Sequence, residues 1–571
     1  MKFEKQPMVN WYDIKQLAST AIKAVISGVF GNFADRREME AALSPGDTFH
    51  DFSKNEDLWI DYVSDLGDGF NSTYTVAHLL AQSEVDVNGG KLKRGNILVM
   101  GGDAVYPTPE ADEYRNRLQG PYNAAFPWIN EQAAARLFVL PGNHDWYDGL
   151  TNFLKLFCQR RSLGNWLTEQ QRSYFAVKLP FDYWLLGIDV QLNADIDLPQ
   201  ISYFRKIAEK EFKPETKIIL CTAEPSWVFK SLNKNDKSHS RIQFFIERVL
   251  LGKDCDYHNK NKDIHIAAIL TGDLHHYSRY EASLYAGLKS QLITAGGGGA
   301  FTHPTHLLKK SMAINDKGAQ ATLQASFPSF GQSKALAWRN LIFPYYSPSM
   351  VLFLGFFHLF TTWFLQSGNP GGGTFMELAS KLPLQFNQLG EFFMLILKSI
   401  RHSPSVVLLN LLLLFGLVLF TDTVTGKGKL NYVAGFVHGV VQLISLYLLI
   451  WVFSVINLGG FGMGINRLDQ IGLFTIEMGI GGGLVSAFIF GVYLLVSALV
   501  LKIHPTEAFS SFRWTGYKNF LRIHLHKDGV SIYPIGIKKV VKNWRDVGSP
   551  EEPSFTGDKI EYSLIDGPIK L

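Results

Sequence analysis

The segment Arg136–Leu150, RLFVLPGNHDWYDGL, places three chemically active side chains directly after a predicted strand. Its apolar run Leu137–Leu140 is typical of a short buried strand, and a Pro-Gly pair ends that strand. An amide, an imidazole and a carboxylate follow at once: Asn143, His144 and Asp145. Because these groups bind metals and transfer protons, the segment predicts a rigid catalytic rim. The alternative is a surface turn that happens to contain His and Asp.

Three further segments repeat this pattern of an apolar strand followed by glycine and polar side chains. They are Leu58–Val63 before SDLGDGFNSTY, Asn96–Met100 before GGDAVYP, and Ile264–Leu270 before TGDLHHYSRY. Open α/β sheets build their sites at the carboxyl ends of strands, so we expect the four segments to converge. Carboxylates, an amide and imidazoles suit divalent cations of the Mn, Fe, Zn or Mg type. The side chains concerned are Asp65, Asp68, Asp103, Asn143, Asp273, His275 and His276.

With these segments the chain resembles the calcineurin-like metallophosphoesterases over roughly residues 58–305, chiefly through GDAVYP and GNHD. The resemblance implies an α/β fold in which two sheets form a sandwich flanked by helices. It also implies two divalent metal ions and hydrolysis of a phosphoester by a hydroxide that bridges them. His144 would assist the leaving group. The ligands implied by similarity are Asp65 and His275 for the first metal, Asp103 for both metals and Asn143 for the second.

The sequence departs from the family pattern at three positions. Gly67 replaces the histidine of the first block and is followed by Asp68. Glu224 lies where the fourth block would have histidine, and Asp273 replaces the first histidine of the last block. Carboxylates in place of imidazoles make the expected shell richer in oxygen, which favours Mn. The predicted metal ligands are Asp65, Asp68, Asp103, Asn143, Glu224, Asp273 and His275, and the predicted catalytic residues are His144 and Asp145.

A run of four glycines, Gly296–Gly299, follows the last of these blocks and precedes His303 and His306. Glycines have no side chain to pack, so they allow backbone N–H groups to approach a ligand closely. The run resembles the one that closes the family's site after its last motif. The alternative is a flexible loop.

The composition excludes several classes of function. A chain of 571 residues with 47% hydrophobic content is long enough for two or more structural units. Its net charge of +4, without a basic cluster interleaved with aromatic residues, predicts no nucleic-acid partner. The three cysteines are widely spaced and form no C-x-x-C motif, which indicates reduced thiols. The N-terminal residues lack the apolar core of a cleavable signal peptide.

Composition and pattern divide the chain into five predicted segments. Residues 11–30 have apolar side chains on one helical face, which we expect to pack on the catalytic domain; a membrane-surface helix is the alternative. The segments are an N-terminal helical extension (1–43), the metallophosphoesterase-like domain (44–310), a connector (311–343), an all-α membrane domain (344–502) and a soluble tail with a β-hairpin (503–571).

Four apolar segments in the membrane domain predict transmembrane helices, for which about 20 apolar residues are needed. Ser405–Thr421 is near the lower limit of that length. His438 and Glu477 are the ionisable exceptions within the spans, and this scarcity of buried polar residues argues against a transporter. The predicted spans are Pro344–Gln366, Ser405–Thr421, Tyr432–Leu458 and Leu473–Leu501.

An even number of spans places both termini on one side of the membrane, and the basic tail favours the cytoplasmic side. The sequence therefore predicts an integral membrane protein whose cytoplasmic catalytic domain hydrolyses a phosphoester, for which a lipid head group is one candidate. The alternative is a degenerate member of the family that binds a phosphorylated ligand or metal without turnover, as a sensor or scaffold. No oligomeric state is predicted.

Overall fold

The computed structural model describes residues 2–20, 22, 49–87, 89–190, 196–261, 263–284, 288–314, 319–368, 371–420, 425–549 and 552–571. The chain forms two compact units. The sheet unit contains Met1–Val9, Ser19–Lys334 and Arg513–Leu571, and the helical unit contains Asn10–Ala18 and Ala335–Phe512. Of the helix expected at 11–30, residues 14–20 and 22 are helical, and the remainder beyond residue 22 lies outside the described residues.

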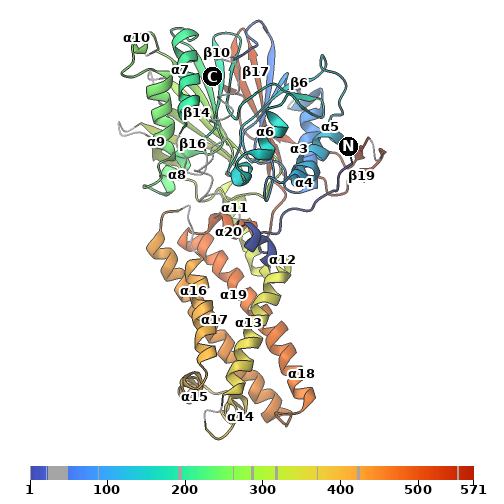
Figure 1. The fold of residues 1–571 in the computed structure, drawn as a ribbon, viewed down its shortest axis with the longest axis vertical. Helices are drawn as coiled ribbons and strands as arrows, with labels where there is room; N and C mark the ends of the chain where they lie inside the picture. The colour runs from blue at the N-terminus through green and yellow to red at the C-terminus, as the bar shows by residue number, and fades with distance from the viewer. Residues whose placement is uncertain are drawn as a thin grey trace. The chain divides into compact units, whose positions relative to one another are not determined.

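Two large mixed sheets form the centre of the sheet unit (Figure 1). The central strands β10, β11, β12 and β14 of the first sheet run parallel to one another. The order in the first sheet is β1 (His50–Asp51), β9 (Phe175–Lys178), β10 (Tyr183–Ile188), β11 (Lys217–Thr222), β12 (His265–Thr271), β14 (Lys289–Ala295), β13 (Tyr277–Ser283), β16 (Gln320–Phe327) and β15 (Ser311–Ala313).

The second sheet contains the other three strands that precede the predicted site residues. Its strands β2, β5 and β6 are parallel neighbours, so their carboxyl ends meet at one edge. The order is β21 (Ser563–Leu564), β18 (Gly529–Ile537), β17 (Lys518–His526), β2 (Leu58–Val63), β5 (Ile97–Met100), β6 (Ala135–Val139), β8 (Trp166–Thr168) and β7 (Ser162–Leu163), and β22 (Ile569–Lys570) pairs with β18. Two small hairpins are β3 (Glu84–Val87) with β4 (Gly90–Lys93) and β19 (Arg545–Asp546) with β20 (Phe555–Thr556).

The two sheets pack face to face, and helices cover their outer faces (Figure 1). Ile60 and Val99 of the second sheet share one buried cluster with Leu185 and Ile219 of the first. This α/β sandwich confirms the fold class expected from the sequence. The first sheet is covered by α7 (Leu198–Lys210), α8 (Ser226–Leu232), α9 (Ser238–Phe244) and η3 (Phe245–Leu250), and the second by α3 (Phe70–Ala81), η1 (Tyr114–Gln119), α5 (Gly120–Ala125) and α6 (Thr151–Phe157). Short helices complete the unit: α4 (Ala111–Glu113), η2 (Asp145–Asp148) and α10 (His258–Asn261).

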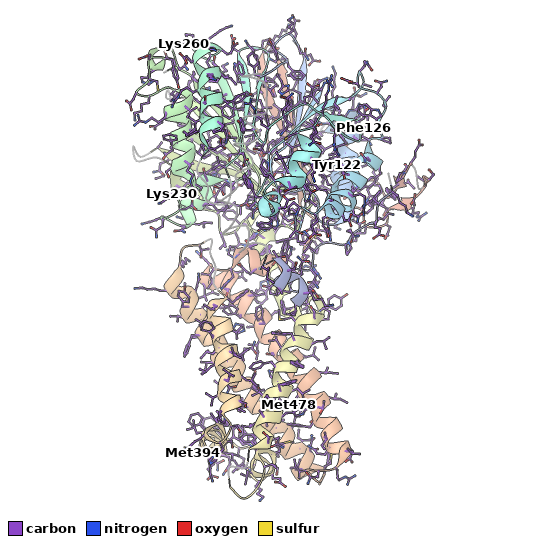
Figure 2. All side chains as sticks on the ribbon, viewed as in Figure 1. Tyr122, Phe126, Lys230, Lys260, Met394 and Met478 are labelled. Carbon is purple, nitrogen blue, oxygen red and sulfur yellow. The ribbon has the colours of Figure 1, made fainter. Side chains whose placement is uncertain are left out.

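Aromatic side chains fill the outer layer of the second sheet. Tyr122 and Phe126, labelled in Figure 2, pack edge-on against the buried Trp166 of β8, with ring centroids 5.5 and 5.0 Å from the Trp166 ring. All three side chains belong to the cluster that α3 and α6 also cover. These large rings bury much apolar surface per residue and so fix this helical layer on the sheet.

The C-terminal hairpin is part of the second sheet and not a separate tail. The sequence correctly predicts the hairpin, which is formed by β17 and β18. However, β17 also pairs antiparallel with β2, so a strand that follows the helical unit in sequence lies beside the strand that precedes Asp65. The predicted segment 503–571 is therefore divided: its residues up to Phe512 belong to the helical unit, and the rest belongs to the sheet unit.

The helical unit consists of antiparallel helices and short connectors. Met478 is buried between its helices, whereas Met394 is 64% exposed (Figure 2). Connecting residues include α11 (Phe330–Ala337), η4 (Trp338–Ile342) and α12 (Phe343–Tyr346). The main helices are α13 (Pro348–Ser367), α14 (Phe375–Ser380), η5 (Phe386–Gln388), α15 (Leu389–Arg401), α16 (Pro404–Leu419), α17 (Gly428–Ser454), η6 (Val455–Gly460), α18 (Leu468–Ile476), η7 (Glu477–Gly481), α19 (Gly482–Val496), η8 (Ser497–Leu501) and α20 (Pro505–Ser510).

Three helical stretches in the described residues are long and apolar enough to cross a membrane: Pro348–Ser367, Gly428–Gly460 and Leu468–Leu501. A fourth candidate is the pair Phe386–Arg401 and Pro404–Leu419, which is bent by 107°. This pair contains the shortest of the four predicted spans. Gly435 and Gly439 of α17 face the backbone or side chains of α16 closely, which is typical of helices that associate in lipid.

The expectation that the helical unit contains almost no buried polar side chains is wrong. Gln442 of α17 lies with its Nε2 3.0 Å from His438 Nε2 and donates to the Ser486 carbonyl of α19 at 3.0 Å. Asn457 donates to Glu477 at 2.7 Å. Hydropathy averages over a window and so misses these residues, whose hydrogen bonds connect neighbouring helices. The buried set also includes His358, Asn431 and Gln470.

We predict that the buried ion pair between β17 and β2 stabilises the sheet unit. Arg522 Nε donates to Asp61 Oδ1 at 3.0 Å, and both side chains are at most 2% exposed. Arg522→Met should lower the free energy of unfolding by about 3–5 kcal/mol, because the Asp61 carboxylate is left buried without its partner. Adding Asp61→Asn should recover part of this loss. Denaturant unfolding of the purified protein measures both values, and equal stability of wild type and Arg522→Met would contradict the prediction.

Candidate metal centre

Four strand ends bring the predicted site residues to one place. Asp65, Asp103 and Asn143 follow β2, β5 and β6 of the second sheet, and Asp273 follows β12 of the first sheet. The backbone turns sharply at three of these positions, with φ of 60° at Asp65, 47° at Asp103 and 64° at Asp273. Asp adopts this left-handed conformation more readily than most residues, which explains how each strand can end on a ligand.

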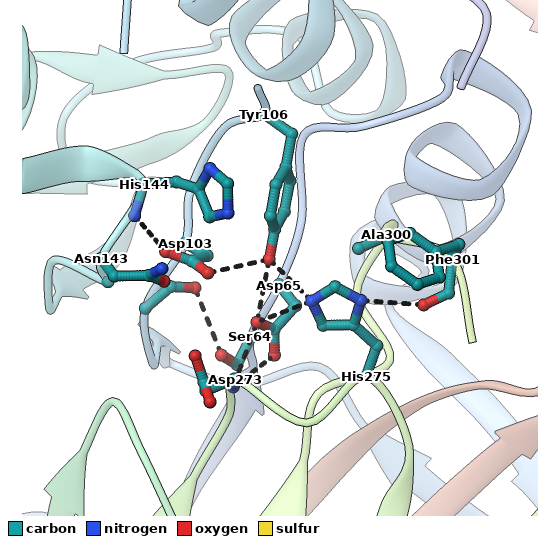
Figure 3. Close-up of polar contacts among 12 residues, drawn as sticks. Ser64, Asp65, Asp103, Tyr106, Asn143, His144, Asp273, His275, Ala300 and Phe301 are labelled. Atoms are coloured by element: carbon teal, nitrogen blue, oxygen red, sulfur yellow. Dashed lines mark hydrogen bonds and ion pairs between the residues drawn. The ribbon is translucent and has the colours of Figure 1, made fainter. Parts of the chain in front are cut away.

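Asp65, Asp103 and His275 form a buried group that could hold a metal ion (Figure 3). One ligand atom of each lies within 4.8 Å of the others. Within the described ranges this is the one group of three or more His, Cys, Asp or Glu side chains with that geometry. Two carboxylate oxygens and one imidazole nitrogen suit a divalent cation of intermediate hardness.

The Tyr106 hydroxyl lies at the centre of this group (Figure 3). It lies 3.1 Å from Asp65 Oδ1, 3.0 Å from Asp103 Oδ2 and 3.0 Å from His275 Nε2. Sequence reasoning missed Tyr106, although the residue stands within the quoted block GDAVYP, three positions after Asp103. Gly67 has no side chain that could bind a metal ion, and the space beside its Cα is filled by the backbone of Ala104 and Val105. Tyr106 instead places an oxygen atom next to the other ligands.

The His275 ring is oriented by the loop that follows the glycine run. Its Nδ1 lies 2.9 Å from the Phe301 carbonyl, which can only accept, so Nδ1 carries the proton and the Nε2 lone pair points toward Tyr106 and Asp65. Burial lowers the pKa of His275, so the imidazole is neutral at neutral pH. A neutral imidazole whose second nitrogen donates to a carbonyl is the usual state of a metal-binding histidine.

Asn143 and His144 complete the rim on the other side of Asp103. The Asn143 Oδ1 atom is buried and has no hydrogen-bond partner, as expected for an oxygen that could bind a cation. The His144 backbone N–H donates to Asp103 Oδ1 at 2.9 Å. The His144 Nδ1 donates to the Pro107 carbonyl at 2.8 Å, which places the lone pair of the neutral ring on Nε2. Burial lowers the pKa of His144 to about 4.

Comparison with known families agrees with this geometry. Residues 58–277 match the model of the calcineurin-like phosphoesterase family. The chain contains a calcineurin-like phosphoesterase domain. The comparison with curated proteins found no match. The family suggested by the sequence motifs is therefore confirmed, and the matched residues include all four strand ends that carry the site.

The carboxylates of two predicted site residues, Asp145 and Asp68, accept hydrogen bonds from residues outside the group Asp65, Asp103 and His275. The Asp145 carboxylate accepts from the N–H groups of Gly142 and Ala104, at 2.8 and 3.0 Å, and from the Tyr114 hydroxyl. These bonds tie the turn after β6 to the turn after β5. The sequence could not separate Asp145 from its neighbour His144, because both follow the same strand and only tertiary contacts distinguish them.

Asp68 also lies outside the buried group. Its Oδ1 accepts from the Val9 N–H at 2.7 Å, and the Arg117 guanidinium donates to its backbone carbonyl at 2.7 Å. The expectation that Asp68 replaces the imidazole lost at Gly67 is thus not supported by its position. Asp68 instead anchors the N-terminal residues to the start of α3.

Asp273 and Glu224 lie next to the group without joining it at the 4.8 Å limit. The Asp273 N–H donates to both oxygens of Asp65, at 3.1 and 3.0 Å. Burial and the nearby Asp103 raise the pKa of Asp273 to about 7. Burial and the nearby Asp273 raise the pKa of Glu224 to about 8. His276, the remaining candidate, is buried and points neither ring nitrogen at a hydrogen-bond partner.

These residues fit divalent cations. Burial and the charges of Asp103 and Asp273 raise the pKa of Asp65 well above its usual value, so several like charges share one buried place. A cation would relieve this repulsion, as protons do in its absence. The unpartnered Asn143 oxygen is a further buried oxygen donor next to Asp103 in the chain's metal-binding rim.

We predict that the metal-free domain loses stability as the pH rises. The pKa values of Asp273 and Glu224 are about 7 and about 8 in the folded protein and return to about 4 on unfolding. Between these limits the folded state binds more protons than the unfolded state, so the free energy of unfolding falls with rising pH. Thermal unfolding of chelator-treated protein from about pH 5 to about pH 8 measures this slope.

Glu224→Gln provides the control for this prediction, because its amide does not titrate. The difference in melting temperature between wild type and Glu224→Gln should shift in favour of the variant as the pH rises. A constant difference across the range would show that Glu224 ionises normally.

Proposed function

We propose that the phosphoesterase domain hydrolyses a phosphoester with two divalent metal ions. The observation that supports this most strongly is the buried group Asp65, Asp103 and His275, whose ligand atoms lie within 4.8 Å of one another inside a domain of this family. We assign the first ion to this group with Tyr106 as a neighbouring oxygen. The second ion would take Asp103, Asn143, Asp273 and Glu224, and the oxygen-rich set favours Mn.

Bound divalent cations supply two kinds of chemistry, an activated water and neutralisation of charge on phosphoryl oxygens. The chain's own residues orient the reactants. His144 presents the lone pair of its Nε2 to a proton of water or substrate, because its Nδ1 is held by Pro107. Its low pKa keeps it neutral at neutral pH, so it accepts a hydrogen bond and does not start as a charged acid.

We assign Asp145 a positioning role in place of the direct catalytic role expected from the sequence. Its carboxylate holds Gly142 and Ala104, and these glycine- and alanine-containing turns carry Asn143 and Asp103. We assign Asp68 a similar role at the N-terminal segment through Val9. Both proposals rest on carboxylate oxygens that already accept hydrogen bonds from backbone groups.

We further propose that the helical unit anchors the protein in a membrane by four crossings. The sheet unit contains chain from both before and after the helical unit, and β2 and β17 pair in one sheet. A folded unit lies on one side of a membrane, so the number of crossings between residues 334 and 513 must be even. Three of them are the long helices, and the bent pair supplies the fourth through α16, whose 16 residues extend over about 24 Å.

The cytoplasmic side is proposed for the sheet unit and both termini. Its support is the basic run near Lys538 and the wide spacing of the three cysteines, which indicates reduced thiols. A membrane-anchored phosphoesterase would act on phosphoesters near the bilayer, and a lipid head group is one such substrate class.

The competing proposal is a domain that binds metal or a phosphorylated ligand without turnover. Gly67, Glu224 and Asp273 favour it, since each replaces an imidazole of the family pattern. A panel of phosphate mono- and diesters, assayed with Mn²⁺, Mg²⁺ or Zn²⁺ and paired with elemental analysis, separates the two proposals. Metal content without hydrolysis of any ester would favour the sensor or scaffold.

We predict that Asp103→Asn removes metal and any hydrolysis. Asp103 touches Tyr106 and the His144 backbone and is the carboxylate between the two assigned ions. The amide removes one negative charge from both sites, so elemental analysis should find at least one ion lost. Asp182→Asn, at an exposed surface ion pair, is the matched control and should keep full metal content. Full metal content and rate in Asp103→Asn would contradict the two-metal assignment.

We predict that Gly372 and Lys429 lie on opposite sides of the membrane. These residues precede and follow the bent helix pair, so an even number of crossings requires the pair to cross. Reporter fusions or accessibility of single engineered cysteines at the two positions test this. Lys429 and the C-terminus should share one compartment. If both positions report the same side, the bent pair is a re-entrant segment and the four-crossing proposal is wrong.

A further inference from the structure

The residues that return from the helical unit contact the loop beside the metal centre. Hydrogen bonds connect this return segment, Arg513–Asn519, to the loop Gly296–His303. The Thr302 N–H donates to the Trp514 carbonyl at 3.0 Å, and the Thr302 hydroxyl donates to the Gly516 carbonyl at 2.6 Å. The Asn519 N–H donates to the Gly297 carbonyl at 3.1 Å, and the Lys518 ammonium donates to the Ala300 carbonyl.

The same loop holds two of the metal-binding residues. The Ala300 N–H donates to the Asp65 carbonyl at 3.0 Å, and the Phe301 carbonyl accepts from His275 Nδ1 at 2.9 Å (Figure 3). The His303 N–H donates to the His275 carbonyl at 3.1 Å, and the two imidazole rings stack with centroids 3.9 Å apart. A shift of this loop would therefore rotate His275 away from Tyr106 and Asp65.

The contacts leave little space for movement. Lys518, Asn519 and Thr302 are completely buried, and lysine is almost never found so unless a partner holds it. Gly297 lies directly against the Asn519 backbone and amide, so a side chain at this position would collide with the return segment. The glycine run is thus packed between two parts of the chain and is not a flexible loop.

We infer that Lys518 and Thr302 are positioning residues for the metal centre, which is completed by the chain that follows the helical unit. Lys518 fixes the Ala300 carbonyl, Thr302 fixes the next turn of the loop, and together they set the direction of His275. This inference rests on the proposed function only in that His275 binds a metal ion. It assigns to the return segment a role in metal binding that a tail added to a finished domain would not have.

The test compares isosteric substitutions that each remove one buried hydroxyl group. Thr302→Val deletes the hydroxyl, whereas Thr302→Ser keeps it. Thr168→Val, in β8, deletes an equally buried hydroxyl that donates to the Arg161 carbonyl at 2.9 Å and accepts from the Arg161 N–H at 2.8 Å. Equilibrium dialysis of the full chain against Mn²⁺, with elemental analysis, gives the metal affinity of each variant, and thermal unfolding gives its stability.

Thr302→Val should weaken Mn²⁺ binding by about tenfold or more, as other changes next to metal ligands do, while Thr302→Ser stays within about twofold of wild type. Thr168→Val should lower the melting temperature without changing Mn²⁺ affinity. Lys518→Met should also weaken Mn²⁺ binding and speed amide hydrogen exchange at residues 297–303. Unchanged affinity in Thr302→Val overturns the inference, as does an equal loss in Thr168→Val.

The outcome of this test does not depend on whether the proposed hydrolysis occurs. Metal affinity is measured without substrate. A protein that binds Mn²⁺ but hydrolyses no ester would therefore refute the proposed phosphoesterase activity and still test the positioning role of Lys518 and Thr302. If Lys518→Met does not fold, the Thr302 pair decides alone. If activity is present, Thr302→Val should lower kcat at saturating Mn²⁺ less than at limiting Mn²⁺, because added metal compensates for a poorly held ligand.

Discussion

The pairing of β17 with β2 is the constraint on which most of this structure depends. It joins residues on the two sides of the helical unit, and its centre is the fully buried Arg522, which donates to Asp61 and to the carbonyl of Leu92 at 2.7 Å. A buried guanidinium is tolerated only when its donors are satisfied, so this contact permits few alternative registers. One consequence is that the second sheet of the phosphoesterase domain can be completed only after the helical unit has been synthesised.

The same strand pairing relates the candidate metal centre to the residues that follow the helical unit. Because β17 follows the return segment, the loop that orients His275 is held by residues that leave the helical unit. The proposed even number of crossings and the proposed support of the metal centre thus both follow from a single strand pairing. An enzyme with an anchor appended to one terminus would have neither property. In the sequence, the helical unit is inserted into the sheet unit.

The sequence predicted the parts of the fold that depend on local pattern. The strands before Asp65, Asp103, Asn143 and Asp273, the C-terminal hairpin and the long apolar helices all carry periodicity or turn signals. It could not predict that β17 pairs with β2, because a strand pattern does not name its partner. It also could not tell which carboxylates belong to the metal-binding group. Asp65 and Asp68 are three residues apart, yet Asp65 belongs to that group whereas Asp68 accepts a hydrogen bond from the Val9 N–H. Tyr106 was missed because an aromatic side chain after a strand usually belongs to the core.

The position of Tyr106 changes the expected effect of Gly67 on the set of metal-binding atoms. Counted from the sequence, Gly67 removes an imidazole and leaves water or Asp68 to replace it. In the structure a phenol oxygen already lies within 3.1 Å of both carboxylates and of His275. The first ion would then have three kinds of oxygen or nitrogen donor around it, and His275 would be its one imidazole. The proposed second position would have oxygen donors from Asp103, Asn143, Asp273 and Glu224. Under the proposed assignment both positions would depart from the imidazole-rich pattern in the same direction, toward harder oxygen ligands. If the enzyme proposal holds, the substitutions at Gly67, Glu224 and Asp273 describe a single shift of the donor set toward oxygen ligands.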